Sequence, residues 1–221
     1  MGEKQYQEPI KEVLTRGVER LGLMTSWAYL DDPKRLAFTF SRYKFVSKML
    51  YGKNQILEIG CGDAFASRLV AQTVGKLTAI DFDQSFIKDA NQRKNGLWPI
   101  DCFCHDILSG PAPGQYDGIF SLDVLEHISP ASEKLFLNNI VNCLHAEGVV
   151  IIGMPSQESQ TYASPQSKEG HVNCKTQDDF KALMEQYFTN VFMFSMNDEV
   201  VHTGFSKMSN YNIALCCNKK T

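Results

Sequence analysis

The stretch "DVLEHI" places two carboxylates and an imidazole three and four residues apart. In a helix that begins there, Asp123, Glu126 and His127 would project from one face. Such a group could hold Mg²⁺ or a similar cation, which would lower the pKa of a bound hydroxyl. Alternatively, Asp123 and Glu126 could form a variant of the capping box and start the helix. His127 is also a candidate general base, because imidazole titrates near neutral pH.

A second histidine lies in a long polar segment, residues 156–173, which carries turn-forming residues and has no helical or strand period. Segments of this length without regular structure are usually functional or disordered. We therefore take His171 as a further candidate catalytic residue. Gln157 and Tyr162 in the same segment could donate hydrogen bonds to a polar substrate.

Gly60 and Gly62 follow the apolar run "ILEI" and provide a turn at which a backbone can approach a ligand closely. A dinucleotide fingerprint would require a third glycine at position 65, which is occupied by Phe65. Asp63 adds a negative charge that would disfavour a pyrophosphate. The turn therefore favours a cofactor with a cationic or zwitterionic end.

Acidic residues recur where successive strands are expected to end. Asp81 follows the glycine turn by about twenty residues, the spacing of a carboxylate that binds the two hydroxyls of a ribose. Phe82 could lie against a purine face, and Asp106 could accept a hydrogen bond from an adenine amino group. Any one of these acids alone could be a helix cap or a turn former. Together with Asp63, their succession favours a nucleoside site.

Alternating strands and helices must position these residues. The sequence pattern predicts helices at 34–50, 63–74, 84–94, 132–145 and 176–188, and strands at 55–60, 76–81, 100–106, 116–123, 148–155, 190–196 and 211–217. This βαβ series implies an α/β fold with a doubly wound, mostly parallel, seven-stranded Rossmann-like sheet and helices on both faces. We expect one domain over residues 1–221. Its parts are an N-terminal helical cover (1–50), a cofactor-binding core (51–155), and an acceptor loop with closing strands (156–221).

Composition excludes several other classes of protein. A chain of 221 residues with 43% hydrophobic residues suits one globular domain. The net charge of −3 gives no basic field for a nucleic acid, so no nucleic-acid partner is expected. No apolar run approaches a membrane span and the N-terminus lacks a signal-peptide core, so we expect a cytoplasmic protein. The seven cysteines include no C-x-x-C pair, which argues against zinc.

The stretches "LEIGCGDAFASRLV", "LTAIDFD", "CHDIL" and "YDGIFSLDVLEHI" resemble, in this order and spacing, the class I S-adenosylmethionine-dependent methyltransferases. They are most similar to the small-molecule branch, which includes the ubiquinone-biosynthesis O-methyltransferases and enzymes of sugar and polysaccharide pathways. The resemblance covers about Ile56 to Pro155. The chain departs from the family pattern at Ala64, where a third glycine is usual.

The resemblance implies a role for each residue around the glycine turn. Glu58, Gly60 and Gly62 would frame the methionine portion of S-adenosylmethionine. Asp81 would bind the ribose hydroxyls, and Phe82 would flank the adenine ring.

Later residues would complete this cofactor site. Asp106 and Ile107 would recognise the edge of the adenine, and the backbone at Leu122 and Asp123 would close over the sulfonium. In related enzymes an N-terminal helix covers the cofactor, and we expect Arg42 to meet the methionine carboxylate from such a helix.

The resemblance predicts an S-adenosylmethionine-dependent methyltransferase that acts on a small polar molecule and releases S-adenosylhomocysteine. Because the loop 156–173 is hydrophilic, we expect O-methylation of a sugar, a sugar nucleotide or a polysaccharide precursor. One alternative is a catechol or quinone-precursor O-methyltransferase with a divalent cation at Asp123, Glu126 and His127, where the ubiquinone enzymes have such a site. Another is a non-catalytic cofactor-binding protein. The oligomeric state stays open.

Overall fold

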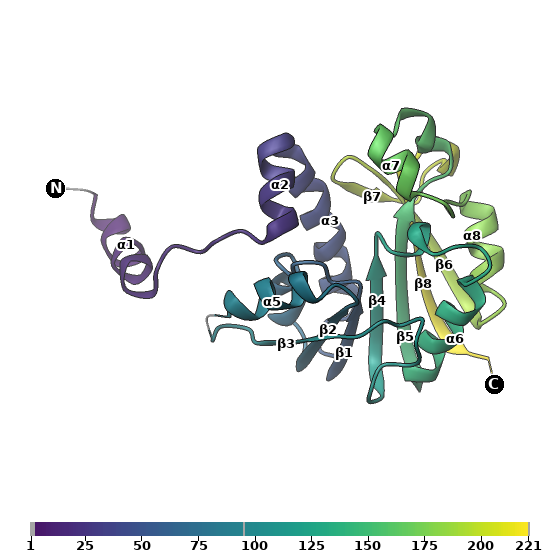
Figure 1. Cartoon of the computed structure of the whole chain (residues 1–221), viewed down its shortest axis with the longest axis horizontal. Coiled ribbons are helices and arrows are strands. Elements are labelled where there is room, and N and C mark those ends of the chain that lie inside the picture. The colour runs from purple at the N-terminus through teal and green to yellow at the C-terminus, as the bar shows by residue number, and fades with distance from the viewer. Residues whose placement is uncertain (1–2, 95, 221) are drawn as a thin grey trace.

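The computed structural model describes residues 3–94 and 96–220. Its strands form a single eight-stranded sheet in the order β3-β2-β1-β4-β5-β8-β6-β7 (Figure 1). Neighbours among the first five strands are parallel, whereas β8, β6 and β7 pair antiparallel. The strands are β1 (Gln55–Ile59), β2 (Lys76–Asp81), β3 (Ile100–Cys104), β4 (Tyr116–Leu122), β5 (Leu144–Pro155), β6 (Phe188–Asn197), β7 (Val200–His202) and β8 (Tyr211–Lys219).

The mostly parallel, doubly wound sheet is confirmed, but the expected number of seven strands is wrong by one. Strand β6 runs on to Asn197, turns at Asp198, whose φ is 50°, and returns as the short strand β7. Ser195 pairs with His202 in this hairpin. The sequence pattern predicted no strand between 196 and 211, because three residues are too few to establish a strand period.

Helices cover both faces of the sheet, as expected. They are α1 (Lys4–Arg16), α2 (Leu23–Asp31), α3 (Lys34–Met49), α4 (Arg68–Ala71), α5 (Gln84–Gln92), α6 (Glu133–Cys143), α7 (Pro165–Gly170) and α8 (Gln177–Met184). Short 3₁₀ helices are η1 (Leu125–His127), η2 (Glu158–Tyr162) and η3 (Ser206–Met208). Among these described helices, none combines the length and apolar character that crossing a membrane requires.

The core lies in two layers, one on each face of the sheet. Helices α6 and α8 bury Phe136 and Phe180 in one layer, and helices α3, α4 and α5 bury side chains such as Val46 in the other. Strand β1 contributes to both layers, since Ile56 and Leu57 point to opposite faces. This double burial explains why the central strands read as continuous apolar runs.

Three segments differ from the sequence pattern. The helix expected at 63–74 is reduced to α4, because the glycine turn continues to Ala64, whose φ is 53°. The segment 156–173, expected to be irregular, contains η2 and α7. Helices α1 and α2 precede the first predicted helix, and α1 projects away from the rest of the chain (Figure 1).

Candidate active site

The glycine turn follows β1 at the carboxyl edge of the sheet and has the backbone that its sequence requires. Gly60 and Gly62 have φ values of 75° and 52°, in the left-handed region that favours glycine. A Cβ atom on Gly60 would lie 2.2 Å from Cγ2 of Val124. Gly60 is therefore needed both for its conformation and for the close approach of the loop after β4.

Asp81 at the end of β2 is buried beside this turn. Its Oδ2 accepts a hydrogen bond of 2.8 Å from the Gly62 amide, and its Oδ1 accepts one of 2.9 Å from the Asp83 amide. Each oxygen keeps a second lone pair, so the carboxylate can still accept from two hydroxyls. The adjacent Phe82 ring is 76% exposed and open to an aromatic partner.

The third strand end lies next to Asp81, because the His105 amide donates to the Asp81 carbonyl at 2.9 Å. Asp106 is exposed, and its Oδ1 accepts from the Leu108 amide at 2.8 Å, which is the turn-forming contact considered as its alternative role. Ile107 is buried in the core, and its carbonyl accepts from Asn139. The structure thus brings Asp81 and Asp106 to one edge, while their roles toward a cofactor stay predictions.

Glu58 lies beneath the turn and is fully buried. The Tyr43 hydroxyl donates to its Oε1 at 2.7 Å. Among the described residues its Oε2 has no partner with hydrogen-bond geometry, although the nearby buried Ser67 hydroxyl favours the ionised form and lowers the pKa. Burial raises the pKa of Glu58 to about 7, and the carboxylates of Asp81 and Asp63 add to the rise. An unpaired, buried carboxylate oxygen fits a site that awaits a donor such as an ammonium group.

Asp63 has a structural role that the sequence did not indicate. Its Oδ2 accepts from the Thr25 amide at 2.8 Å, and its Oδ1 accepts from the Thr25 hydroxyl at 3.0 Å. These bonds satisfy the first turn of α2. The carboxylate therefore fixes α2 against the glycine turn.

Arg42 and Asp123 form a close ion pair between α3 and the end of β4. Nη1 of Arg42 lies 2.9 Å from Oδ1 and 2.7 Å from Oδ2 of Asp123. The guanidinium also lies over the Tyr211 ring, 3.8 Å from its centroid. Leu122, the last residue of β4, is buried just before this pair. Whether Arg42 also meets a methionine carboxylate stays a prediction.

The capping-box interpretation of "DVLEHI" is wrong. The 3₁₀ helix η1 begins only at Leu125, and no side chain caps it. Asp123 precedes it with a φ of 57°, a left-handed conformation that Asp tolerates better than most residues. Since Asp123 lies outside the helix and pairs with Arg42, it does not share a helical face with Glu126 and His127.

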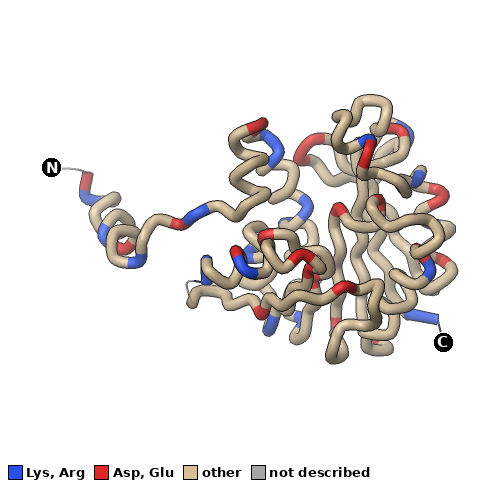
Figure 2. The backbone as a smooth tube through the Cα atoms, viewed as in Figure 1, with Lys and Arg blue, Asp and Glu red and all other residues tan. Residues whose placement is uncertain are grey.

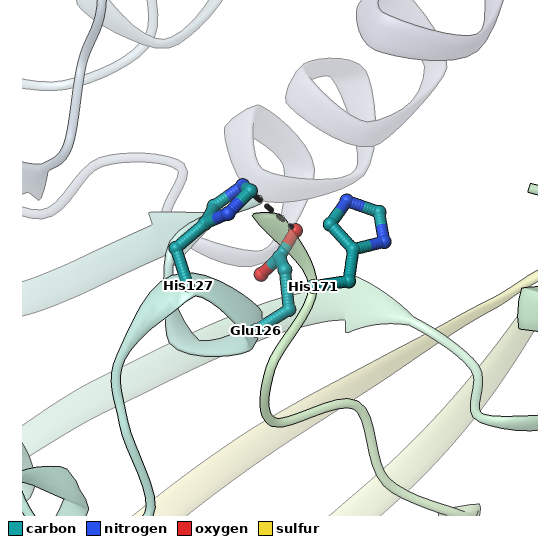
Figure 3. A group of neighbouring side chains, drawn as sticks. All are labelled: Glu126, His127 and His171. Carbon is teal, nitrogen blue, oxygen red and sulfur yellow. Dashed lines mark ion pairs between the residues drawn. The ribbon is translucent and has the colours of Figure 1, made fainter. Parts of the chain in front are cut away.

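The structure instead assembles Glu126, His127 and His171 (Figure 3). One ligand atom from each residue lies within 4.8 Å of the others. His127 Nε2 is 4.0 Å from Glu126 Oε1, and the two imidazole rings are 5.1 Å apart between centroids. Among the described residues this is the group of His, Cys, Asp and Glu side chains that could hold a metal ion.

Glu126 is unusual for a carboxylate. Its side chain is 1% exposed, and in the described part of the chain neither oxygen accepts a hydrogen bond from another residue; its own backbone amide and the Arg42 charge are the groups that favour its ionised form. Burial, with the nearby Asp123 charge, raises its pKa well above the ordinary range. Its backbone carbonyl accepts from the amides of Val172 and Asn173, which holds the loop after α7 against η1.

Both imidazoles are oriented by hydrogen bonds at Nδ1. His127 donates from Nδ1 to the Gly170 carbonyl at 2.9 Å, and His171 donates to Oε1 of Gln160 at 2.8 Å. Nε2 of Gln160 donates a hydrogen bond to the Ser156 carbonyl, which orients Oε1 of Gln160 toward His171. Because both acceptors are oxygens, Nδ1 of each ring is the donor, and the neutral tautomer with this proton has its lone pair on Nε2, the arrangement found in metal-ligating histidines.

The sequence placed His171 among the candidates but not in this cluster. Its partners lie 44 and 45 residues earlier in the chain, and their meeting depends on the fold of the segment 156–173. The parallel packing of β4 beside β5 was the available signal, because the loops after neighbouring parallel strands emerge at the same edge.

A family model described as a methyltransferase domain matches residues 56–148. The ubiquinone biosynthesis O-methyltransferase of Rickettsia prowazekii (strain Madrid E) is 30% identical over 124 residues, which cover 55% of this chain and 46% of that protein. The enzyme of the same name from Rickettsia canadensis (strain McKiel) is 28% identical over 137 residues, 59% of this chain and 55% of its own. The chain thus spans about half the length of the curated relatives it matches.

Two solved structures have a similar fold. The N-methyltransferase NodS from Bradyrhizobium japonicum WM9, in complex with S-adenosylhomocysteine, has a TM-score of 0.65 and 20% identity, over 98% of this chain and 99% of that one. The methyltransferase domain of the bacterial protein CtHen1-C has a TM-score of 0.66 and 16% identity, over 81% and 98%. Residues 56–148 thus match a methyltransferase domain, and the chain shares the fold of these two solved methyltransferases.

Proposed function

We propose that this protein transfers a methyl group from S-adenosylmethionine to a hydroxyl oxygen of a small molecule, beside a divalent cation held by Glu126, His127 and His171. The observation that carries the proposal is the buried Glu126 carboxylate, which accepts no hydrogen bond from another described residue and lies beside two imidazoles. Burying a charge is costly unless the charge is paired. A cation between Glu126 and the two imidazoles would supply that pairing.

The donor set bears on which ion is bound. Two imidazoles and one carboxylate suit first-row transition ions such as Mn²⁺, Fe²⁺ or Co²⁺ better than Mg²⁺, which prefers oxygen ligands. We therefore favour a transition ion over Mg²⁺, which the sequence suggested as one possible ion. When bound, such an ion lowers the pKa of a coordinated hydroxyl and fixes its position.

Asp123 belongs to this site in a different way from that expected. Its two oxygens are both within 2.9 Å of one guanidinium nitrogen of Arg42, so its charge is already balanced. Arg42 thereby keeps Asp123 in place at the end of β4, next to the backbone proposed to close over the sulfonium. We assign Asp123 a positioning role rather than a place among the cation ligands.

The proposed cofactor site lies at the same edge of the sheet. S-adenosylmethionine supplies an activated methyl group, so the protein mainly has to align the acceptor and exclude water. The unpaired Oε2 of Glu58 suits the methionine ammonium, and the two lone pairs left on Asp81 suit the ribose diol. The remaining proposed contacts are Gly60, Gly62, Phe82, Asp106, Ile107, Leu122 and Arg42.

The acceptor is proposed to present two adjacent oxygens, since a cation can bind both and so orient the one that is methylated. The relatives are named for ubiquinone biosynthesis, which favours a catechol. The hydrophilic segment 156–173, with Tyr162 exposed and Gln157 beside it, favours a sugar or sugar nucleotide. Both classes offer vicinal oxygens and can be compared directly.

A second mechanism is supported by the half-exposed ring of His127. Its Nε2 has a lone pair and could accept the acceptor proton as a general base. This mechanism needs no cation, so a chelator separates it from the first.

The test is transfer of labelled methyl from S-adenosylmethionine to a panel of catechols and sugar nucleotides, with Mn²⁺ or with a chelator. We expect transfer that requires the cation and is lost in Glu126→Gln. Glu147→Gln is the matched control, because Glu147 is exposed at the opposite end of β5. Transfer that is indifferent to the chelator but lost in His127→Ala would replace the cation by a base. Tight binding of S-adenosylhomocysteine with no transfer to any hydroxyl compound would overturn the proposal in favour of a non-catalytic protein.

A further inference from the structure

Helix α1 presents an apolar stripe that no other part of the described chain covers. Tyr6, Ile10, Val13 and Leu14 recur at the spacing of one helical face, and each is at least 46% exposed. The helix has no buried residue. A helix of 13 residues that contains Pro9 is marginal by itself in water, so its apolar face needs a partner.

Helix α2 presents a second exposed apolar stripe, in which the Trp27 ring also has the Arg35 guanidinium 5.1 Å from its centroid. Leu23, Met24, Trp27 and Leu30 lie on one side of the helix and are between 45% and 83% exposed. The other side of α2 rests on the body of the protein, where Asp63 binds Thr25. The stripe therefore faces away from the body.

The linker keeps α1 away from the α2 stripe of its own chain. Nη1 of Arg68 lies 2.7 Å from Oε2 of Glu19, and Nη2 of Arg20 lies 3.5 Å from Oδ1 of Asp89. The Leu23 amide also donates to Asp89. These contacts tie the C-terminal part of the linker to the body, and the rest extends from the base of α2 to α1, which lies apart from the body (Figure 1).

The charge pattern of α1 argues against a membrane surface as the partner. Acidic and basic residues are mixed along the helix (Figure 2): Lys4, Glu8, Lys11, Glu12 and Arg16. Helices that bind anionic bilayers concentrate Lys and Arg on the polar face. A mixed pattern is typical of a helix that packs on another protein surface.

We propose that two copies of this chain exchange their α1 helices, so that the apolar stripe of each α1 packs on the α2 stripe of the other copy. Two-fold symmetry would form this contact twice. With eight stripe side chains per chain and roughly 100 Å² covered on each, the interface would bury about 1,600 Å², the size of a stable protein complex. A contact between two α1 helices alone would bury much less.

The test uses the full chain in sedimentation equilibrium at several concentrations. We expect a dimer, with a dissociation constant at least about tenfold higher in Leu14→Glu and in Leu30→Glu. Thr15→Glu is the matched control, because Thr15 lies on the polar side of α1 and should leave the dimer unchanged. Mixing the two stripe variants should restore partial dimerisation, since one intact α1 then meets one intact α2.

Three results would overturn the exchange. If the wild-type chain stays monomeric at all concentrations, a second copy is excluded as the partner. This holds whether or not the chain binds neutral phosphatidylcholine vesicles or anionic phosphatidylserine vesicles. A dimer that Leu30→Glu leaves intact excludes the α2 stripe. A dimer that both variants disrupt but that mixing does not restore indicates pairing between like stripes rather than exchange.

Discussion

Replacing Glu58 by Gln should change how the stability of the protein depends on pH. Glu58 is buried, accepts a hydrogen bond from Tyr43 and has a pKa raised from 4.5 to about 7. Gln keeps the shape and can still accept from Tyr43, but it cannot ionise. The variant therefore isolates the cost of placing a charge at this position.

The direction follows from proton linkage. The folded protein holds the Glu58 proton more tightly than the unfolded chain, so protonated Glu58 stabilises the fold fully below pH 4.5. This contribution is lost as the pH rises through about 7. The change in pKa corresponds to about 3 kcal/mol of unfolding free energy. As the pH is raised from 4.5 to 8, the free energy of unfolding of Glu58→Gln should therefore increase by about 3 kcal/mol relative to that of the wild type.

The measurement is urea unfolding, followed by circular dichroism, of the cofactor-free protein at a series of pH values across that window. Glu147→Gln removes an exposed carboxylate and should follow the wild type at every pH. If the curves of wild type and Glu58→Gln stay parallel, Glu58 does not titrate in this window and the argument from burial fails.

Three further substitutions test the turn and its neighbours. Asp81→Asn should weaken binding of S-adenosylhomocysteine by about 1–3 kcal/mol in calorimetry; an unchanged affinity would remove Asp81 from the cofactor site. Gly60→Ala should lower the urea midpoint through both its φ and its contact with Val124, and adding Val124→Ala should recover part of the loss; no recovery would mean that the contact does not matter. Thr25→Val should cost about 1 kcal/mol of stability and expose the linker 17–22 to protease, because it removes a donor from the buried Asp63. Resistance equal to that of the wild type would contradict the docking role of Asp63.

The central sheet and the cofactor edge could be predicted because several local signals agree there. Strand β1 is an apolar run that ends in Gly60 and Gly62, and β2 is an apolar run that ends in Asp81. In a parallel sheet these ends must meet at one edge. Because strand length, glycine position and acidic strand ends agree, the architecture of the sheet and the order of these residues along its edge could be predicted.

The candidate cation site could be predicted only in part, because its geometry depends on the backbone conformation of Asp123 and on the short helix α7. The D-x-x-E spacing favoured a helix from Asp123, but the left-handed φ of Asp123 and its pairing with Arg42 take it out of the helix. His171 reaches the site through α7, whose start was signalled by Ser164 before Pro165, a typical cap and first helical position. That short signal was outweighed by the polar composition of the segment.

The shortness of α4 and the existence of strand β7 were not predicted, for a related reason. Ala64 extends the glycine turn by adopting a positive φ, which no period in the sequence reveals. In β7 only Val200, Val201 and His202 form the strand, and its position is set by pairing with β6 rather than by its own pattern. Tertiary pairing decides such short elements.

The most direct test of the account is binding of Mn²⁺ to the chelator-treated protein, measured by calorimetry and by the electron paramagnetic resonance signal of free Mn²⁺. We expect one bound ion per chain, with affinity reduced at least about tenfold in Glu126→Gln and in His171→Ala. His145→Ala, at the opposite end of β5, should bind as the wild type does. Binding that is absent in the wild type, or unaffected by Glu126→Gln, would contradict a cation site at Glu126, His127 and His171.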